Sequence, residues 1–293
     1  MKTQHTSISE IGSTSKVMLA LMERKQHFSI LRCSLFLFLV FTCFQVTQAQ
    51  TYSPVKSIQS KGADISTDYL GNLYIIKEFR LSKYDMNGKP LSVYEDYSNG
   101  RITSVDVSDP MKIIVFYEDF MKVKVLDKTL SELALYDFNQ SGYSSISALA
   151  HSRDDDFWIF DNTAFLLKKV DENGKALYKS EKFNMLFTET VQVRQIVDYE
   201  DYIYLNDPNN GIYVFDRFGT YQKRIPILGA DKIQIIQGII VYFQNETLYS
   251  YNTVDLREEQ MNLPSWVHGS YGQLQKDRVY IVEADRISIY TFK

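Results

Sequence analysis

Hydrophobic and polar residues alternate in short runs along most of this chain, and turn residues separate the runs. The segment LGNLYIIKEFRLSKYDMNGKPLSVYED, residues 70–96, is dense in β-branched and aromatic residues and is interrupted by glycine turns at Gly71 and Gly88. A period of two predicts β-strands, whereas no extended stretch after residue 50 shows the 3.6-residue apolar period of a helix. The pattern therefore predicts an all-β protein.

The pattern recurs about every 40 residues. LSKYDMNGKPL at 81–91 has a near copy in LKKVDENGKAL at 167–177. Each copy contains an alternating strand, a more apolar strand, a third strand and, after a turn, a fourth. The residues that end the third strands are Asp85, Asp127, Asp171, Asp216, Asn252 and Thr291. Six repeats of four short strands predict a six-bladed β-propeller, with four antiparallel strands per blade.

The first and last repeats predict how the ring closes. The last repeat ends at YTFK, after its third strand, while SPVKSIQS at 53–60 precedes the first repeat. This N-terminal segment is predicted to form the fourth strand of the last blade, which leaves no open seam. The propeller is thus predicted to span residues 50–293.

Residues 1–49 show a different pattern. Basic residues between positions 24 and 32 precede the apolar run LFLFLVFTCF at 35–44, and small residues follow up to Ala49. This order is typical of a secretory signal peptide, and the run is shorter than the roughly 20 residues of a membrane span. The preceding residues are predicted to be disordered, with Met1 and Met22 both open as the start. We expect cleavage after Ala49 and export to the periplasm or surface of a bacterial cell; an uncleaved anchor is the alternative.

Composition narrows the function classes. Both cysteines, Cys33 and Cys43, lie within residues 1–49, so the mature chain has no thiol and no disulfide. Residues 50–293 contain 27 basic and 34 acidic side chains, a net charge of −7. Nucleic-acid binding depends on neutralising phosphates, so no nucleic-acid partner is expected.

Two segments carry a resemblance to a known family. ISTDYLGNLYIIKEFRLSKYDMNGKPL, 65–91, and ISALAHSRDDDFWIFDNTAFLLKKVDENGKAL, 146–177, resemble the NHL-type repeat of six-bladed propellers of the NHL-like or TolB-like type. Lys77 and Tyr117 depart from the family, because NHL repeats usually carry Asp at these positions, and the second and fifth repeats lack the glycine turns. The resemblance implies the fold and a binding face, and implies no particular ligand.

Candidate catalytic groups are few. The mature chain has only two histidines, His151 and His268, in different repeats, and a zinc site would need further nitrogen or sulfur ligands. The sequence contains no Gly-x-Ser-x-Gly elbow, phosphate loop or dinucleotide fingerprint. No cofactor is expected, and the prediction is a non-enzymatic protein.

One enzymatic alternative stays open. Six-bladed lactonases and esterases, which the chain resembles in its expected fold, hold a calcium ion in the central channel with Glu, Asn and Asp. Oxygen ligands of this kind follow the second strands here, and they are Asp161, Asn162, Asn206, Asp207, Asn245 and Glu283. Lys77 and Tyr117 interrupt the set, and such residues also serve to cap turns. A calcium-dependent lactonase or esterase, or a structural cation, remains the alternative.

Two loops between repeats are rich in large side chains. These loops are KFNMLFTETV at 182–191 and LPSWVHGSYG at 263–272. They are expected to share one face of the propeller with the loops after the second strands, and either to contact a partner or to pack between blades. The predicted binding residues are Met185, Phe187, Trp266, His268, Tyr271, Lys77, Asp161, Asn206 and Glu283. The function predicted from sequence is a monomeric binding or scaffold module for a protein, peptide or glycan.

Overall fold

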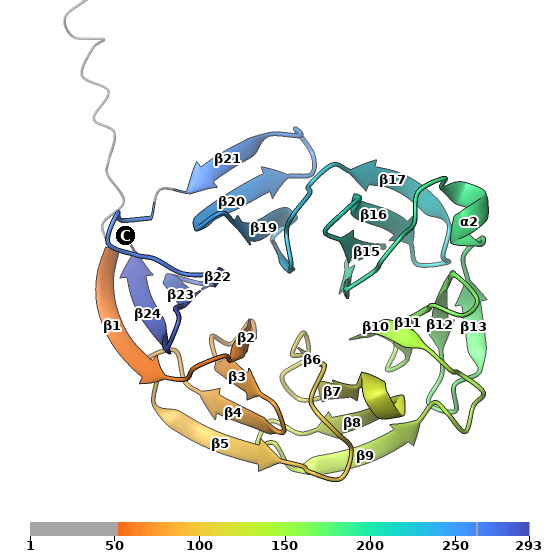
Figure 1. The fold of residues 1–293 in the computed structure, drawn as a ribbon, viewed down its shortest axis with the longest axis horizontal. Coiled ribbons are helices and arrows are strands. Elements are labelled where there is room, and N and C mark those ends of the chain that lie inside the picture. The colour runs from red at the N-terminus through yellow and green to blue at the C-terminus, as the bar shows by residue number, and fades with distance from the viewer. Residues whose placement is uncertain (1–51, 262, 293) are drawn as a thin grey trace, which may run out of the picture. The chain divides into compact units, whose positions relative to one another are not determined.

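The computed structural model describes residues 52–261 and 263–292. In this part, six four-stranded antiparallel sheets form a ring around a common axis (Figure 1), so the six-bladed propeller is confirmed. Blades one and two consist of β2 (Asp64–Thr67), β3 (Leu73–Lys77), β4 (Arg80–Tyr84) and β5 (Pro90–Glu95), then β6 (Ser104–Asp106), β7 (Ile113–Tyr117), β8 (Lys122–Leu126) and β9 (Glu132–Asp137). Blades three and four consist of β10 (Ile146–His151), β11 (Phe157–Asp161), β12 (Leu166–Val170) and β13 (Ala176–Lys179), then β14 (Gln195–Tyr199), β15 (Tyr202–Asp207), β16 (Gly211–Asp216) and β17 (Tyr221–Ile225). Blade five consists of β18 (Ile233–Ile236), β19 (Ile239–Gln244), β20 (Thr247–Asn252) and β21 (Glu258–Met261).

Blade six closes the ring in the predicted manner. It consists of β22 (Tyr271–Gln275), β23 (Arg278–Val282), β24 (Arg286–Phe292) and the N-terminal strand β1 (Tyr52–Gln59). β1 pairs antiparallel with β24, and Ser57 lies opposite Ser288 (Figure 1). The last blade therefore has four strands only because the first strand of the propeller completes it.

The polar residue that ends a third strand caps the turn that follows. A side-chain oxygen of Asp85 accepts hydrogen bonds from the backbone N–H groups two and four positions later, and Asp127, Asp171 and Asp216 repeat this arrangement at 2.7–2.9 Å. Gly88 in the first of these turns has φ 76°, which a side chain disfavours. This turn is the local reason why the motif repeats along the sequence.

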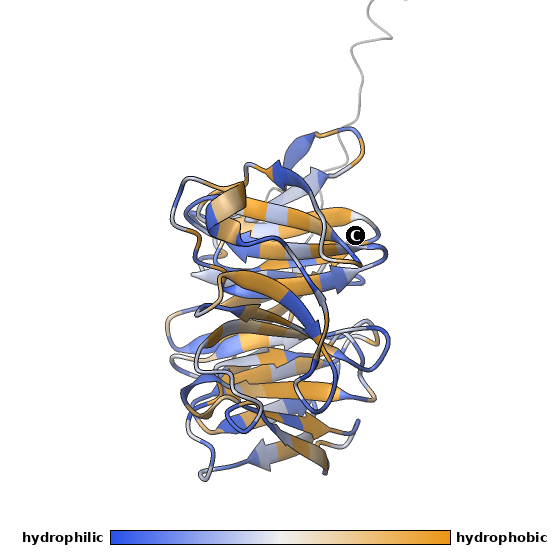
Figure 2. Cartoon of the chain, turned by 90° about the vertical axis from the view of Figure 1, so that its right-hand side faces the viewer, coloured by the Kyte–Doolittle hydropathy of each residue, from blue (hydrophilic) through white to orange (hydrophobic). Residues whose placement is uncertain are grey.

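The hydrophobic core is divided among the six interfaces between blades. One buried cluster lies at each interface, and each combines side chains from the two neighbouring sheets. Between blades three and four, for example, Trp158 of β11 packs in the same cluster as Phe215 of β16. Figure 2 shows the propeller edge-on, with hydrophobic strands in the interior and more hydrophilic loops on both sides.

Helical structure in the described residues is confined to short segments. α2 (Phe183–Leu186) and the 3-10 turn η1 (Glu118–Phe120) are examples, and no helix of this part is long and apolar enough to cross a membrane. The predicted signal peptide, 1–49, lies outside the described residues. Its cleavage site and the boundary with the propeller therefore stay predictions.

Candidate functional site

The strand order assigns the connections to two faces. In an antiparallel four-stranded sheet, the turn between the second and third strands lies at the same end as the connection to the next blade. We call this end the loop face and the opposite end the turn face. Hydrogen bonds support the assignment: the backbone N–H of Ile102, between blades one and two, donates to the carbonyl of Glu78 in the β3–β4 turn at 2.7 Å. Both predicted aromatic loops are on the loop face.

α2 presents one apolar side chain and buries another. Phe183 is 1% exposed, and its ring lies 4.9 Å from that of Phe160 and 5.3 Å from that of Phe215. Phe187 is half-buried against Phe183 and Tyr213. Met185, on the same helical turn, is 79% exposed. The predicted loop is thus a platform whose aromatic residues fix the backbone while Met185 faces solvent.

The second aromatic loop lies between blades five and six. Trp266 is 54% exposed, and its ring contacts that of Tyr290 edge-on at 5.3 Å. The exposed His268 lies with Nδ1 3.4 Å from a carboxylate oxygen of Glu246. Val267, between them, is buried and anchors the loop. Like α2, this loop places a buried anchor residue, Val267, close to an exposed large side chain, Trp266.

Tyr271 is different, because it belongs to the innermost strand of blade six. Its hydroxyl accepts a 2.6 Å hydrogen bond from Gln273, and its half-buried ring lies 5.7 Å from the Lys232 ammonium group. Burial raises the pKa of Tyr271, and the negative charge of Asp64 adds to this effect. Asp64 also forms an ion pair with Lys232. Tyr271 therefore belongs to a polar cluster among the inner strands.

The four polar residues of the predicted surface differ in exposure. Lys77 is exposed at the end of β3, and Glu283, after β23, pairs with Arg286 at 3.1 Å. Asp161 is buried, accepts from two backbone N–H groups of its own turn and binds the Lys168 ammonium group at 2.7 Å. Asn206 is fully buried and donates to a backbone carbonyl of the 226–232 connection at 2.8 Å. Two of the four thus support loops from within the fold.

The geometry does not favour the calcium alternative. The Asp207 carboxylate accepts hydrogen bonds from the backbone of Asn209 and Gln192, and Asn245 is exposed in its own turn. With Asp161 committed to Lys168, these oxygen ligands cap separate turns. In the described residues, no three His, Cys, Asp or Glu side chains are grouped so that they could hold a metal ion.

A belt of hydrogen bonds joins the six innermost strands. At each interface between neighbouring blades, a side chain of one inner strand bonds the backbone of the next blade or of the connection that leads into it. The belt side chains are Ser66, Asp106, Ser147, Gln195, Gln234 and Gln273. Gln234 makes two bonds to Leu274, accepting from its N–H at 2.9 Å and donating to its carbonyl at 3.2 Å. The belt satisfies strand edges that would otherwise be open toward the axis.

Sequence reasoning missed several exposed apolar residues. On the loop face these are Tyr97, Phe120, Phe165 and Leu228. The turn face also exposes such residues, which include Tyr69, Phe218, Val254 and Leu256. The tight turns of that face are therefore less polar than their Asp and Gly residues suggest. A clear difference between the faces is connection length, because fifteen residues, 180–194, join β13 to β14.

These features define the class of protein as a six-bladed β-propeller with four antiparallel strands per blade. No protein-family model matches the chain, and no curated protein matches its sequence. Among solved structures, the chain is similar to a streptogramin B lyase, with a TM-score of 0.56, 14% identity, and coverage of 83% of this chain and 98% of that one. It is also similar to a protein of unknown function from Bacteroides thetaiotaomicron VPI-5482, with a TM-score of 0.58, 11% identity, and coverage of 84% and 76%.

A third similar structure is a WD40 domain. The WD40 β-propeller domain of Doa1 matches with a TM-score of 0.54, 11% identity, and coverage of 83% of this chain and 97% of that one. At such identities the likeness shows the fold alone. A lyase and a WD40 domain are both similar to this chain in fold, so function has to be argued from the surface of this chain.

Proposed function

We propose that the chain is an exported, non-enzymatic binding module that engages a protein, peptide or glycan through its loop face. The observation that carries this proposal is the pairing of anchor and exposed side chain in α2. Phe183 is 1% exposed and Met185, two residues later, is 79% exposed. A fixed backbone loses little conformational entropy when a partner binds, which favours affinity.

Trp266 repeats this arrangement between blades five and six, beside the buried Val267. Met185 belongs to the connection between blades three and four, so blades four and five lie between the two sites along the ring. Such spacing suits a macromolecular partner that spans the loop face. His268, Lys77 and Glu283 supply a polar rim.

The other predicted residues act by holding this surface in place. Phe187 packs beneath α2, and Tyr271 belongs to the inner cluster around Lys232. Asp161 and Asn206 fix their loops through buried hydrogen bonds. The working chain is proposed to be the monomeric segment 50–293, in the bacterial periplasm or on the cell surface, after removal of a signal peptide that ends at Ala49.

The experiment is a pull-down from a native envelope extract with purified protein, followed by affinity measurement on the captured partner. Met185→Ala and Trp266→Ala should each weaken binding by about 1–2 kcal/mol while the melting temperature stays within a few degrees. Phe218→Ala, an exposed aromatic residue on the turn face, is the matched control. Equal loss in the control, or unchanged binding in both loop-face variants, would contradict the proposed surface.

Two further measurements test the remaining parts of the proposal. Calcium calorimetry together with a lactone and aryl-ester hydrolysis screen addresses the enzymatic alternative, and turnover that depends on calcium would refute a purely binding role. The mass of the protein recovered from the envelope fraction should correspond to a chain that begins at Gln50. A chain that retains residues 1–49 would contradict cleavage.

A further inference from the structure

The connections between blades differ in length, and the shortest one lies at the closing seam. Four residues, 60–63, join β1 of blade six to β2 of blade one, whereas the other five connections contain seven to fifteen residues. The longer connections insert buried side chains between neighbouring sheets, such as Ile102, Phe138, Phe183 and Val267. The short connection contributes only Ala63 to the core. The wedge between blades six and one is therefore less filled than the others.

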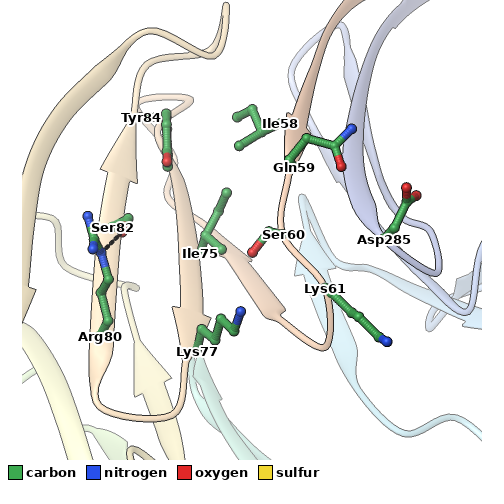
Figure 3. A pocket seen from close by; sticks show the side chains of 10 residues that line it. All are labelled: Ile58, Gln59, Ser60, Lys61, Ile75, Lys77, Arg80, Ser82, Tyr84 and Asp285. Atoms are coloured by element: carbon green, nitrogen blue, oxygen red, sulfur yellow. Dashed lines mark hydrogen bonds between the residues drawn. The ribbon is translucent and has the colours of Figure 1, made fainter.

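A cavity of about 490 Å³ occupies this wedge, and we call it the seam cavity. Figure 3 shows that β1 and the start of the 60–63 connection form one wall, while β3 and β4 form the other. The buried Ile75 and the half-buried Ile58 and Tyr84 give it an apolar part. Lys77 and Lys61 lie at one end, and Tyr84 and Ile58 lie at the other (Figure 3).

The polar lining is cationic. Three basic residues, Lys61, Lys77 and Arg80, line the cavity, and Asp285 is the single acidic lining residue. Arg80 pairs with Glu95 at 3.0 Å, and Asp285 pairs with the neighbouring Arg286 at 3.2 Å. Within residues 52–261 and 263–292, neither Lys61 nor Lys77 has an ion pair. The cavity lining thus contains two lysines without an ion pair among the described residues, in a segment, 50–293, that carries a net charge of −7.

We propose that the seam cavity binds a small organic carboxylate, with its carboxylate at the Lys77 ammonium group, Lys61 at the rim, and its carbon skeleton against Ile58, Ile75 and Tyr84. The volume lies within the range of about 300–1,000 Å³ that is usual for small-molecule sites, and a few convergent polar groups beside an apolar wall are typical of them. The Lys77 ammonium group suits a carboxylate, which accepts charge-assisted hydrogen bonds. Acidic sugars and apolar carboxylic acids both have this chemistry. The proposal goes beyond the binding module described above and does not depend on Met185 or Trp266.

Calorimetric titration of the full mature chain with D-glucuronate and with hexanoate tests the proposal and separates the two sources. At least one carboxylate should bind, and its uncharged counterpart, glucose or hexanol, should bind at least about tenfold more weakly, the loss expected for one charge-assisted contact. Lys61→Gln with Lys77→Gln should cause a similar or larger loss. Lys77→Arg should retain binding because the charge remains.

Two controls make the result specific to this cavity. Lys56→Gln removes an exposed lysine of β1 that does not line the cavity, and it should leave affinity unchanged. Ser60→Phe should fill the cavity in the way that the longer connections fill the other wedges, and it should abolish binding without lowering the melting temperature. The proposal is overturned if native protein binds neither carboxylate, if it binds only inorganic phosphate, or if Lys56→Gln weakens binding as much as the cavity variants do.

Discussion

Gln234 offers a direct test of the belt that joins the inner strands. Its amide makes two hydrogen bonds to the backbone of Leu274 in the next blade, at 2.9 and 3.2 Å, and a third to Thr67 at 3.1 Å. Gln234→Ala leaves the N–H and carbonyl of the buried Leu274 without these partners. An unsatisfied backbone group costs about 1–3 kcal/mol when water cannot replace the bond. The belt is partly accessible from the axis, so we expect a total of about 2 kcal/mol.

Such a loss should lower the melting temperature by about 4–8 °C in a domain of this size. Calorimetry gives this shift, and urea unfolding at constant m gives the free energy of unfolding independently. Gln260→Ala, an exposed glutamine on the outer strand of the same blade, should change stability by less than about 0.5 kcal/mol. Gln195→Ala removes the equivalent pair of bonds to Ile233 and should match Gln234→Ala. If Gln234→Ala were no less stable than Gln260→Ala, the belt would contribute nothing to closure.

Three further predictions concern stability. Gly211→Ala should destabilise the fold by about 1–3 kcal/mol in urea unfolding, because φ is 104° and a Cβ would lie 2.5 Å from the carbonyl oxygen of Ile225. Burial raises the pKa of Tyr74 and Tyr280. The stability that their protonated hydroxyls contribute is therefore complete below about pH 10 and falls as the pH rises further. In an alkaline titration, the ultraviolet absorbance of their phenolates should appear only when the protein unfolds. Burial acts to raise the pKa of Asp96, but hydrogen bonds from Lys124, Ser98 and Asn99 outweigh it and hold that pKa below its usual range. The stability gained in this way is lost as the pH falls below about 4. Asp96→Asn should therefore lose less stability over this pH range in an acid titration monitored by fluorescence.

The architecture could be predicted from the sequence because its determinants are local. A period of two marks each strand, and the Asp that ends a third strand marks the turn, as Asp85 and Asp171 show. Ring closure followed from the count of strands in the last repeat, and the pairing of β1 with β24 confirms it. These signals need no knowledge of which side chains meet in space.

The candidate site was less predictable, because exposure depends on tertiary packing. Phe183, Met185 and Phe187 look alike in sequence, yet the neighbouring sheets bury the first, half-bury the last and leave Met185 at the surface. Asp161 and Asn206 were expected at the rim, and the structure places both inside the fold. A polar residue after an inner strand has a turn backbone within reach, and bonding that backbone satisfies it before any ligand does.

The seam cavity shows why connection length is more informative here than strand sequence. All six interfaces have a hydrophobic cluster built from two sheets, so the strands alone do not distinguish one wedge from another. The side chains delivered by the connections decide how far each wedge is filled. At the seam, the connection 60–63 is short because β1 ends beside β24 and the chain must enter β2 directly. Pairing of β1 with β24 closes the ring at its outer strand. The short connection that follows leaves the wedge between blades six and one open at the loop face, where Lys61 and Lys77 lie.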